Sequence, residues 1–397
     1  MPSDRGVPAA AATQPVAGIE ASQRRAADAW LLAHGLPAVL RPGRLVRRLW
    51  SRSAPALAGF AVLMANTIVV VTVTGQHAID IDGRPTRGEW FVLALLVLVV
   101  PIAATVGWLV SRIPGPRERM LAGTGAVVVA LLGAVFGGPS SYPVRNLMLV
   151  VLGVATTVVL TATGVGSILG WVARTVMSHL VEAGSLLLRA LPVLLLTFLV
   201  FFNSPVWLMA ATVSRARLWV ALAFLAAIAA AFVVSVTVDR VRTMVNTAEP
   251  DVDRVARLDG TPFATMPEPP DAEPLTRIER LNVYFVLVVS QLAHIMVVAV
   301  VTALLFFVLG LILLSPELLA VWTRNGSSDG TLLGMTIPVP QALIQVTMFL
   351  TALTFMYLSA RAVTDAQYRE QYLNPAIDDF RLTLAARNRY RAALSAR

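Results

Sequence analysis

Eight long apolar runs, separated by polar segments, set the pattern of this chain. No Arg, Asp or Glu falls inside any of them, although the 397 residues include 32 basic and 23 acidic ones. About 20 apolar residues, at 1.5 Å rise each, cross a hydrocarbon layer of roughly 30 Å as an α-helix. The pattern predicts an all-α polytopic membrane helix bundle of about eight transmembrane helices, at residues 54–75, 90–110, 120–136, 147–170, 190–213, 218–238, 281–314 and 341–360.

The polar segments around these runs define the rest of the organisation. We expect a cytoplasmic N-terminal tail over 1–53, one membrane domain over 54–360, and a cytoplasmic helical tail over 361–397. Within the membrane domain, residues 239–280 predict a flexible cytoplasmic linker, because their stretch 261–274 holds five prolines. This linker ends at Thr276 and Glu279, whose spacing is that of a capping box at the start of a helix.

The arginines predict the orientation. All 32 basic residues are Arg, and 26 of them lie on one side of the alternating runs against six on the other. By the positive-inside rule, both termini are expected in the cytoplasm, with the chain in the plasma (cell inner) membrane. The arginines flank the runs instead of gathering in one segment, which argues against nucleic acid as a partner and favours anionic lipids.

The segment before the first run carries the clearest lipid-binding signal. Residues 19–34 predict a surface helix that ends at Gly35 and Pro37. Cations beside an anionic leaflet contribute about 1 kcal/mol each. We therefore expect a lipid-surface site made of Arg41, Arg44, Arg47, Arg48 and Arg52.

Irregular positions inside the runs predict breaks and close contacts. Asn203-Ser204-Pro205 lies within the fifth run, where a proline predicts a kink or a broken helix. The pairs Gly133/Gly137 and Gly166/Gly170 have the four-residue spacing that lets helix backbones approach.

Two further amphipathic helices are expected on the cytoplasmic side. Residues 171–189 place polar side chains on one stripe, as an interfacial helix or as an extension of the fourth run. In the C-terminal tail, Asn374 and Pro375 have the residue types of an N-cap and a first helical position.

Few polar side chains fall inside the runs, and they are the candidates for a ligand or a transport path: Asn203, Gln291, His294 and Gln345. Gln291 and His294 share one helical face. An interhelical hydrogen bond is the simpler interpretation of this pair. There is no Cys, and the four His are far apart, so no metal or other cofactor is expected.

Two acidic groups outside the runs have alternative interpretations. Asp365, Arg369 and Glu370 follow the last run, either as a local ion pair or as a site where a partner docks. Asp80 and Asp82 lie in the first external loop, a position where membrane glycosyltransferases also carry acidic residues.

Three stretches resemble an uncharacterised actinobacterial family of multi-pass integral membrane proteins. They are 189–207, which includes Phe202-Asn203-Ser204-Pro205-Val206-Trp207, the pair of motifs Leu281-Asn282 and Ser290-Gln291, and Ala362 to Glu370. The family has no assigned activity, so the resemblance implies a membrane fold and no reaction. The Asn-Ser-Pro insert departs from an Asn-X-Glu-Val-Trp pattern in relatives, so this chain lacks an acid at that place.

Together these observations predict a non-enzymatic scaffold or accessory component of a cell-envelope membrane complex. Its expected partners are the bilayer, anionic lipids at the cytoplasmic face and another membrane protein. The alternatives are a transporter or channel for an apolar or lipid-like solute and, through Asp80 and Asp82, an enzyme acting on lipid-linked substrates.

Overall fold

The computed structural model is a bundle of α-helices with one two-stranded antiparallel hairpin. Among the residues that it describes, seven helices are long and apolar enough to cross a membrane. The predicted all-α class is therefore confirmed. The described residues are 21–40, 43, 48–75, 85–138, 140–179, 191–246, 258–267, 274–324, 329–332, 335–364 and 366–395.

The first four candidate spans pack together around α3. They are α3 (Leu49–Thr74), α4 (Arg87–Ser111), α5 (Pro116–Phe136) and α6 (Pro143–Ala162). Glycines allow the closest approach: a Cβ at Gly133 would lie 2.6 Å from the Met64 carbonyl oxygen, and one at Gly137 would lie 2.5 Å from Thr67 Oγ1. The close packing predicted at this pair is confirmed.

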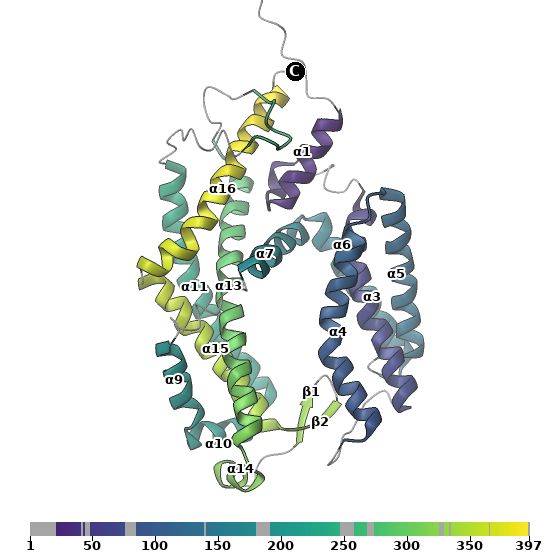
Figure 1. Cartoon of the computed structure of the whole chain (residues 1–397), viewed down its shortest axis with the longest axis vertical. Helices are drawn as coiled ribbons and strands as arrows, with labels where there is room; N and C mark the ends of the chain where they lie inside the picture. Colours follow the sequence, from purple (N-terminus) through teal and green to yellow (C-terminus); the bar gives the residue numbers. More distant parts are fainter. Residues whose placement is uncertain are drawn as a thin grey trace, which may run out of the picture.

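A second group of helices surrounds α15, which contacts all the others and is the most buried of the seven candidate spans. Figure 1 shows the two groups side by side, with α7 (Val165–His179) between them, in contact with both α6 and α13. The second group consists of α9 (Leu191–Phe201), α10 (Ser204–Thr212), α11 (Arg215–Asn246), α13 (Arg277–Leu313) and α15 (Gln341–Thr364).

The fifth apolar run is two short helices, so the break predicted there is confirmed. Asn203 is extended between α9 and α10, and Pro205 lies in the first turn of α10. Proline has no N–H to give to the Phe201 carbonyl four residues before it. The Trp207 indole Nε1–H donates to that carbonyl instead, at 2.6 Å. The pieces are 11 and 9 residues long, each short of the roughly 20 that a span needs.

The fourth run is divided as well. Helix α6 ends at Ala162 and α7 begins at Val165, because Gly164 has a φ of +81°, in the left-handed region that favours glycine. The helix predicted over 171–189 is thus separate from the fourth span. Its part 180–189 lies outside the described residues. At Gly170, the nearest described neighbour of an added Cβ is Arg174 of the same helix, 3.9 Å away, so this glycine makes no close helix contact.

Both ends of the described chain lie at the same end of the molecule (Figure 1). We call it the arginine-rich end. It holds α1 (Ala21–Ala33), the turn η1 (Pro37–Val39), residues 258–267, the starts of α3, α5 and α13, and the last turns of α16 (Ala366–Ser395).

Helix α16 differs from the sequence expectation. It begins at Ala366 and continues through Asn374 and Pro375, so the helix start predicted at Asn374 is wrong. One proline removes a single backbone hydrogen bond. The burial of Phe380, Ala386 and Tyr390 farther along α16 favours the helix over that local signal.

The opposite end of the molecule carries α14 (Pro316–Thr323) and a hairpin of β1 (Asp329–Leu332) and β2 (Met335–Pro340). The strands pair Gly330 with Ile337 and Thr331 with Thr336. The Arg215 guanidinium at the start of α11 donates to the Thr331 carbonyl and, at 2.9 Å, to Gln341 Oε1. The hairpin is thereby joined to the first residues of both α11 and α15.

Candidate functional site

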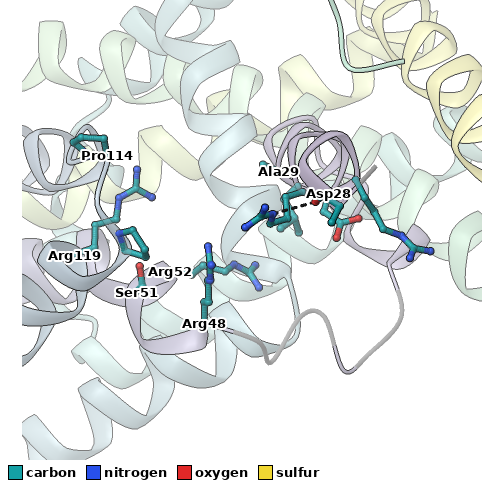
Figure 2. Close-up of a pocket in the computed structure, with 12 residues that line it drawn as sticks. Asp28, Ala29, Arg48, Ser51, Arg52, Pro114 and Arg119 are labelled. Carbon is teal, nitrogen blue, oxygen red and sulfur yellow. Dashed lines mark hydrogen bonds between the residues drawn. The ribbon is translucent and has the colours of Figure 1, made fainter. Parts of the chain in front are cut away.

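A pocket of about 710 Å³ lies at the arginine-rich end, between α1, the start of α3 and the turn that leads into α5. Figure 2 shows Arg48, Arg52 and Arg119 on one side of it and Asp28 of α1 on the other. Five arginines and one acid line this space, which we call the arginine pocket. Its walls are formed by Ala21, Arg24, Arg25, Asp28, Ala29, Leu32, Arg48, Ser51, Arg52, Pro114, Pro116 and Arg119.

The start of α3 adds backbone donors to this wall. Arg48 takes the left-handed conformation, with a φ of 60°, and among the described residues neither a capping side chain nor an acid in the first turn covers the helix end. The first backbone bond runs from the Arg52 N–H to the Arg48 carbonyl, so the N–H groups of the three preceding residues have no partner within the helix. The positive end of the α3 dipole therefore adjoins the pocket at Ser51.

The start of α5 is arranged differently. Pro116 follows the N-cap Gly115, and Glu118 places an acid in the first turn. The Arg119 guanidinium donates to the carbonyls of Ile113, at 2.5 Å, and Ser111, at 3.0 Å. Arg119 thus holds the turn between α4 and α5, and Glu118 offsets the positive helix end there.

Two pocket arginines carry donors that have no acceptor within the described part of the chain. The Arg24 Nε atom is buried without a hydrogen-bond partner among the described residues. The exposed Arg48 side chain likewise makes no hydrogen bond or ion pair within that part of the chain. Arg25 differs, because its Nε donates to the Ala21 carbonyl of its own helix at 3.0 Å. The pocket therefore holds guanidinium donors that an anion can satisfy.

Helix α1, which forms one wall, is tied to distant parts of the chain. The Tyr390 hydroxyl donates to Asp28 Oδ1. The Gln23 side chain donates to the Pro262 carbonyl at 3.1 Å and to Thr265 Oγ1 at 2.8 Å. Trp30 packs edge-on against Phe263, with ring centroids 5.1 Å apart. Residues 258–267, which belong to the segment expected to be a flexible linker, are here part of a packed core.

A buried ion pair lies in the same core. Arg387 and Glu279 are each about 1% exposed and lie 2.9 Å apart, and Arg391 approaches the other Glu279 oxygen at 2.8 Å. Glu279 also accepts from the Thr276 N–H at 2.9 Å and completes the predicted capping box. This buried pair, with every carboxylate oxygen bonded, joins the first turn of α13 to α16, and breaking it would leave a buried charge without its partner.

The four residues predicted to bind a ligand or line a path do not line the arginine pocket. Asn203 is exposed between α9 and α10. Gln291 is buried on α13, and His294, one turn below, has Nδ1 2.9 Å from the Ser290 carbonyl. Gln345 is buried on α15, with its Oε1 atom unpartnered among the described residues. The sequence prediction therefore names residues on three separate elements.

Several other predicted residues fall outside the described part of the structure. Arg41, Arg44 and Arg47 of the lipid-surface site do so, while Arg48 and Arg52 line the arginine pocket. Asp80, Asp82 and Asp365 also lie outside it, as do the side chains of Arg369 and Glu370.

The sequence reading missed Arg24, Asp28 and Arg119 as members of one site. A partial signal existed, since residues 19–34 predict a helix and Arg24 and Asp28 lie four apart on one face. Arg119 of α5, which lines the same pocket, is about a quarter of the chain away, and a pairing over that distance leaves no local pattern. In the described ranges, no group of three His, Cys, Asp or Glu side chains gathers to hold a metal ion.

Comparison with protein-family models, curated proteins and solved structures gave no match to this chain. The function must therefore be argued from the arginine pocket and the packing around it.

Proposed function

We propose that this chain is a non-enzymatic scaffold or accessory subunit of the plasma membrane, whose arginine-rich end lies in the cytoplasm against anionic lipid and presents a rigid docking surface to a membrane partner. The excess of arginine at that end supports the orientation. If α9 and α10 together cross the membrane once, they bring the seven candidate spans to eight crossings.

The observation that carries this proposal is the shared core of the arginine-rich end. Leu31 of α1, Phe263 of the segment 258–267, Val286 of α13 and Phe380 of α16 belong to one buried cluster. Segments so far apart in the sequence pack together only at a cost in chain entropy. A folded surface at the end of a membrane bundle is what a docking platform needs.

Site-specific photo-crosslinking in intact cells tests the proposal. A photoreactive residue at the exposed positions Ala26 or Ser395 should give discrete protein adducts. The control position is Val220, which is 71% exposed on the apolar surface of α11 and should give none. Adducts absent at every position of the arginine-rich end, or reporter fusions that place either terminus outside the cytoplasm, would overturn the proposal.

One observation favours a transporter for an apolar or lipid-like solute as the second candidate. The facing helices α13 and α15 bury polar atoms that lack a partner among the described residues, namely Ser290 Oγ, Thr302 Oγ1, Gln345 Oε1 and Ser359 Oγ. Such atoms are costly in a membrane interior unless water or the polar group of a lipid-like solute satisfies them. Proteoliposomes should then move a labelled lipid, and Gln345→Leu should slow this movement while Thr105→Val on the exposed face of α4 should not.

A further inference from the structure

We propose that the arginine pocket binds the phosphate group of one anionic phospholipid headgroup in a defined site. The proposal rests on the proposed function for the placement of this end at the membrane surface. It goes beyond a general attraction between arginines and an anionic leaflet, because it requires a particular set of side chains and one bound lipid.

The chemistry of the wall matches a phosphate. Arg24 has a buried Nε without an acceptor, and Arg48 has no partner among the described residues. Guanidinium groups donate paired N–H bonds in the geometry of phosphate oxygens. The start of α3, which no described side chain caps, adds backbone N–H groups without a partner inside the helix at the same wall, and a helix N-terminus is a common backbone site for a phosphate.

The acids around the pocket set a limit on the ligand charge that it favours. Asp28 lies in the wall with its Oδ1 accepting from Tyr390, and Glu118 lies in the first turn of α5. Against them stand the five wall arginines. The net charge of these groups is therefore positive, so the pocket favours an anion.

The position of the pocket favours a phosphate that is carried by a lipid. Arg52 comes two residues before the start of the apolar run 54–75, so the pocket adjoins the level at which α3 enters the hydrocarbon. On α5, the wall residue Arg119 is followed by Met120 and Leu121, which are 47% and 70% exposed. Exposed apolar side chains next to a cationic pocket provide surface for acyl chains below a bound headgroup. A volume of about 710 Å³ is within the range of small-molecule sites and exceeds what phosphate alone fills.

Lipid titration of the full-length protein in neutral detergent, followed by native mass spectrometry, tests this inference. The probes are phosphatidic acid, phosphatidylglycerol and phosphatidylcholine. We expect one anionic lipid to bind at least about tenfold more tightly than phosphatidylcholine. Arg24→Gln and Arg48→Gln should each weaken this binding by about tenfold or more, the effect of losing one charge-assisted hydrogen bond to the phosphate.

Two matched variants separate the pocket from the general charge of this end. Arg117→Gln removes the same charge from an exposed residue of α5 that does not line the pocket, and should change binding by less than about twofold. Asp28→Asn keeps an oxygen that can accept the hydrogen bond from Tyr390 but removes a negative charge from the pocket wall. It should therefore tighten the binding of the anionic lipid. Equal effects of Arg24→Gln, Arg48→Gln and Arg117→Gln would overturn the pocket site, because the lipid would then respond to net charge alone.

Binding of water-soluble phosphates tests whether the phosphate in the pocket must belong to a lipid. Inorganic phosphate and glycerol 3-phosphate should bind far more weakly than the lipid and should not displace it. Binding of either as tightly as phosphatidic acid would overturn the lipid assignment. The crosslinking test of the proposed function uses different positions and a protein adduct as its readout, so each proposal can fail while the other stands.

Discussion

The Tyr390 hydroxyl donates a hydrogen bond to Asp28, a residue 362 positions earlier in the chain. The bond joins α16 to α1, and Asp28 also lines the arginine pocket. The last turns of the chain therefore help to position one wall of the proposed lipid site.

Tyr390→Phe should loosen α1 without disturbing the membrane helices. The loss of one hydrogen bond lowers stability by about 1 kcal/mol. Because the change is local, amide hydrogen exchange in α1 should become several-fold faster, while α15 should be unaffected. Tyr142→Phe, at a side chain that is 71% exposed at the other end of the molecule, is the control. Unchanged exchange in α1 would show that other contacts suffice to hold it.

The buried ion pair predicts a larger effect. Arg387→Ala leaves the Glu279 carboxylate buried beside Arg391 alone, and should destabilise the protein by about 3 kcal/mol. Replacing both members, Glu279→Met with Arg387→Met, should be less harmful than Arg387→Ala, since no buried charge is left unpaired and Arg391, which is 30% exposed, can reach water. Arg391→Ala, at a side chain that is 30% exposed, should cost at most about 1 kcal/mol. Thermal unfolding in detergent measures all three.

Two glycines of α5 form a matched pair. Gly133→Ala would place its Cβ 2.6 Å from the Met64 carbonyl oxygen of α3, so the two helices must separate, at a cost of about 1–3 kcal/mol. Gly125→Ala meets open space and should be neutral or stabilising by up to about 1 kcal/mol, since alanine favours the helix. Thermal unfolding should place Gly125→Ala at or above wild type and Gly133→Ala below it. The reverse order would contradict the packing of α3 on α5.

The broken fifth run depends on one tryptophan. Trp207→Phe keeps most of the buried ring but removes the donor to the Phe201 carbonyl, which Pro205 cannot replace. An unsatisfied carbonyl in this apolar setting should cost about 1–3 kcal/mol. Trp219→Phe, at a ring that is 60% exposed, should cost much less. Comparable unfolding temperatures for the two variants would argue against this role for the indole N–H.

Local features of the sequence predicted local features of the fold. The absence of charge predicted the long helices, Pro205 predicted the break between α9 and α10, and Thr276 with Glu279 predicted the start of α13. Each of these features is decided by interactions between residues that are close in the sequence, and such interactions can be recognised from the sequence alone. The second role of Glu279, as the partner of Arg387, had no such local signal.

The sequence did not predict the arginine pocket as a unit. Arg48 and Arg52 were expected to meet a lipid surface, but their assembly with Arg24 and Arg119 depends on how α1 packs on the bundle. That packing depends on Trp30 and Phe263, which belong to segments interpreted as a surface helix and a linker. Long-range contacts of this kind have no periodicity that a single sequence reveals.

The central position of α15 has a consequence for biosynthesis. Of the seven candidate spans it has the lowest mean hydropathy and the largest buried share, and it is the last of them to leave the ribosome. Alone, it would partition into lipid less readily than the spans made before it, and α9, α10, α11 and α13 provide the surface that it needs. We therefore expect the earlier helices to stay close to one another until α15 has been placed among them.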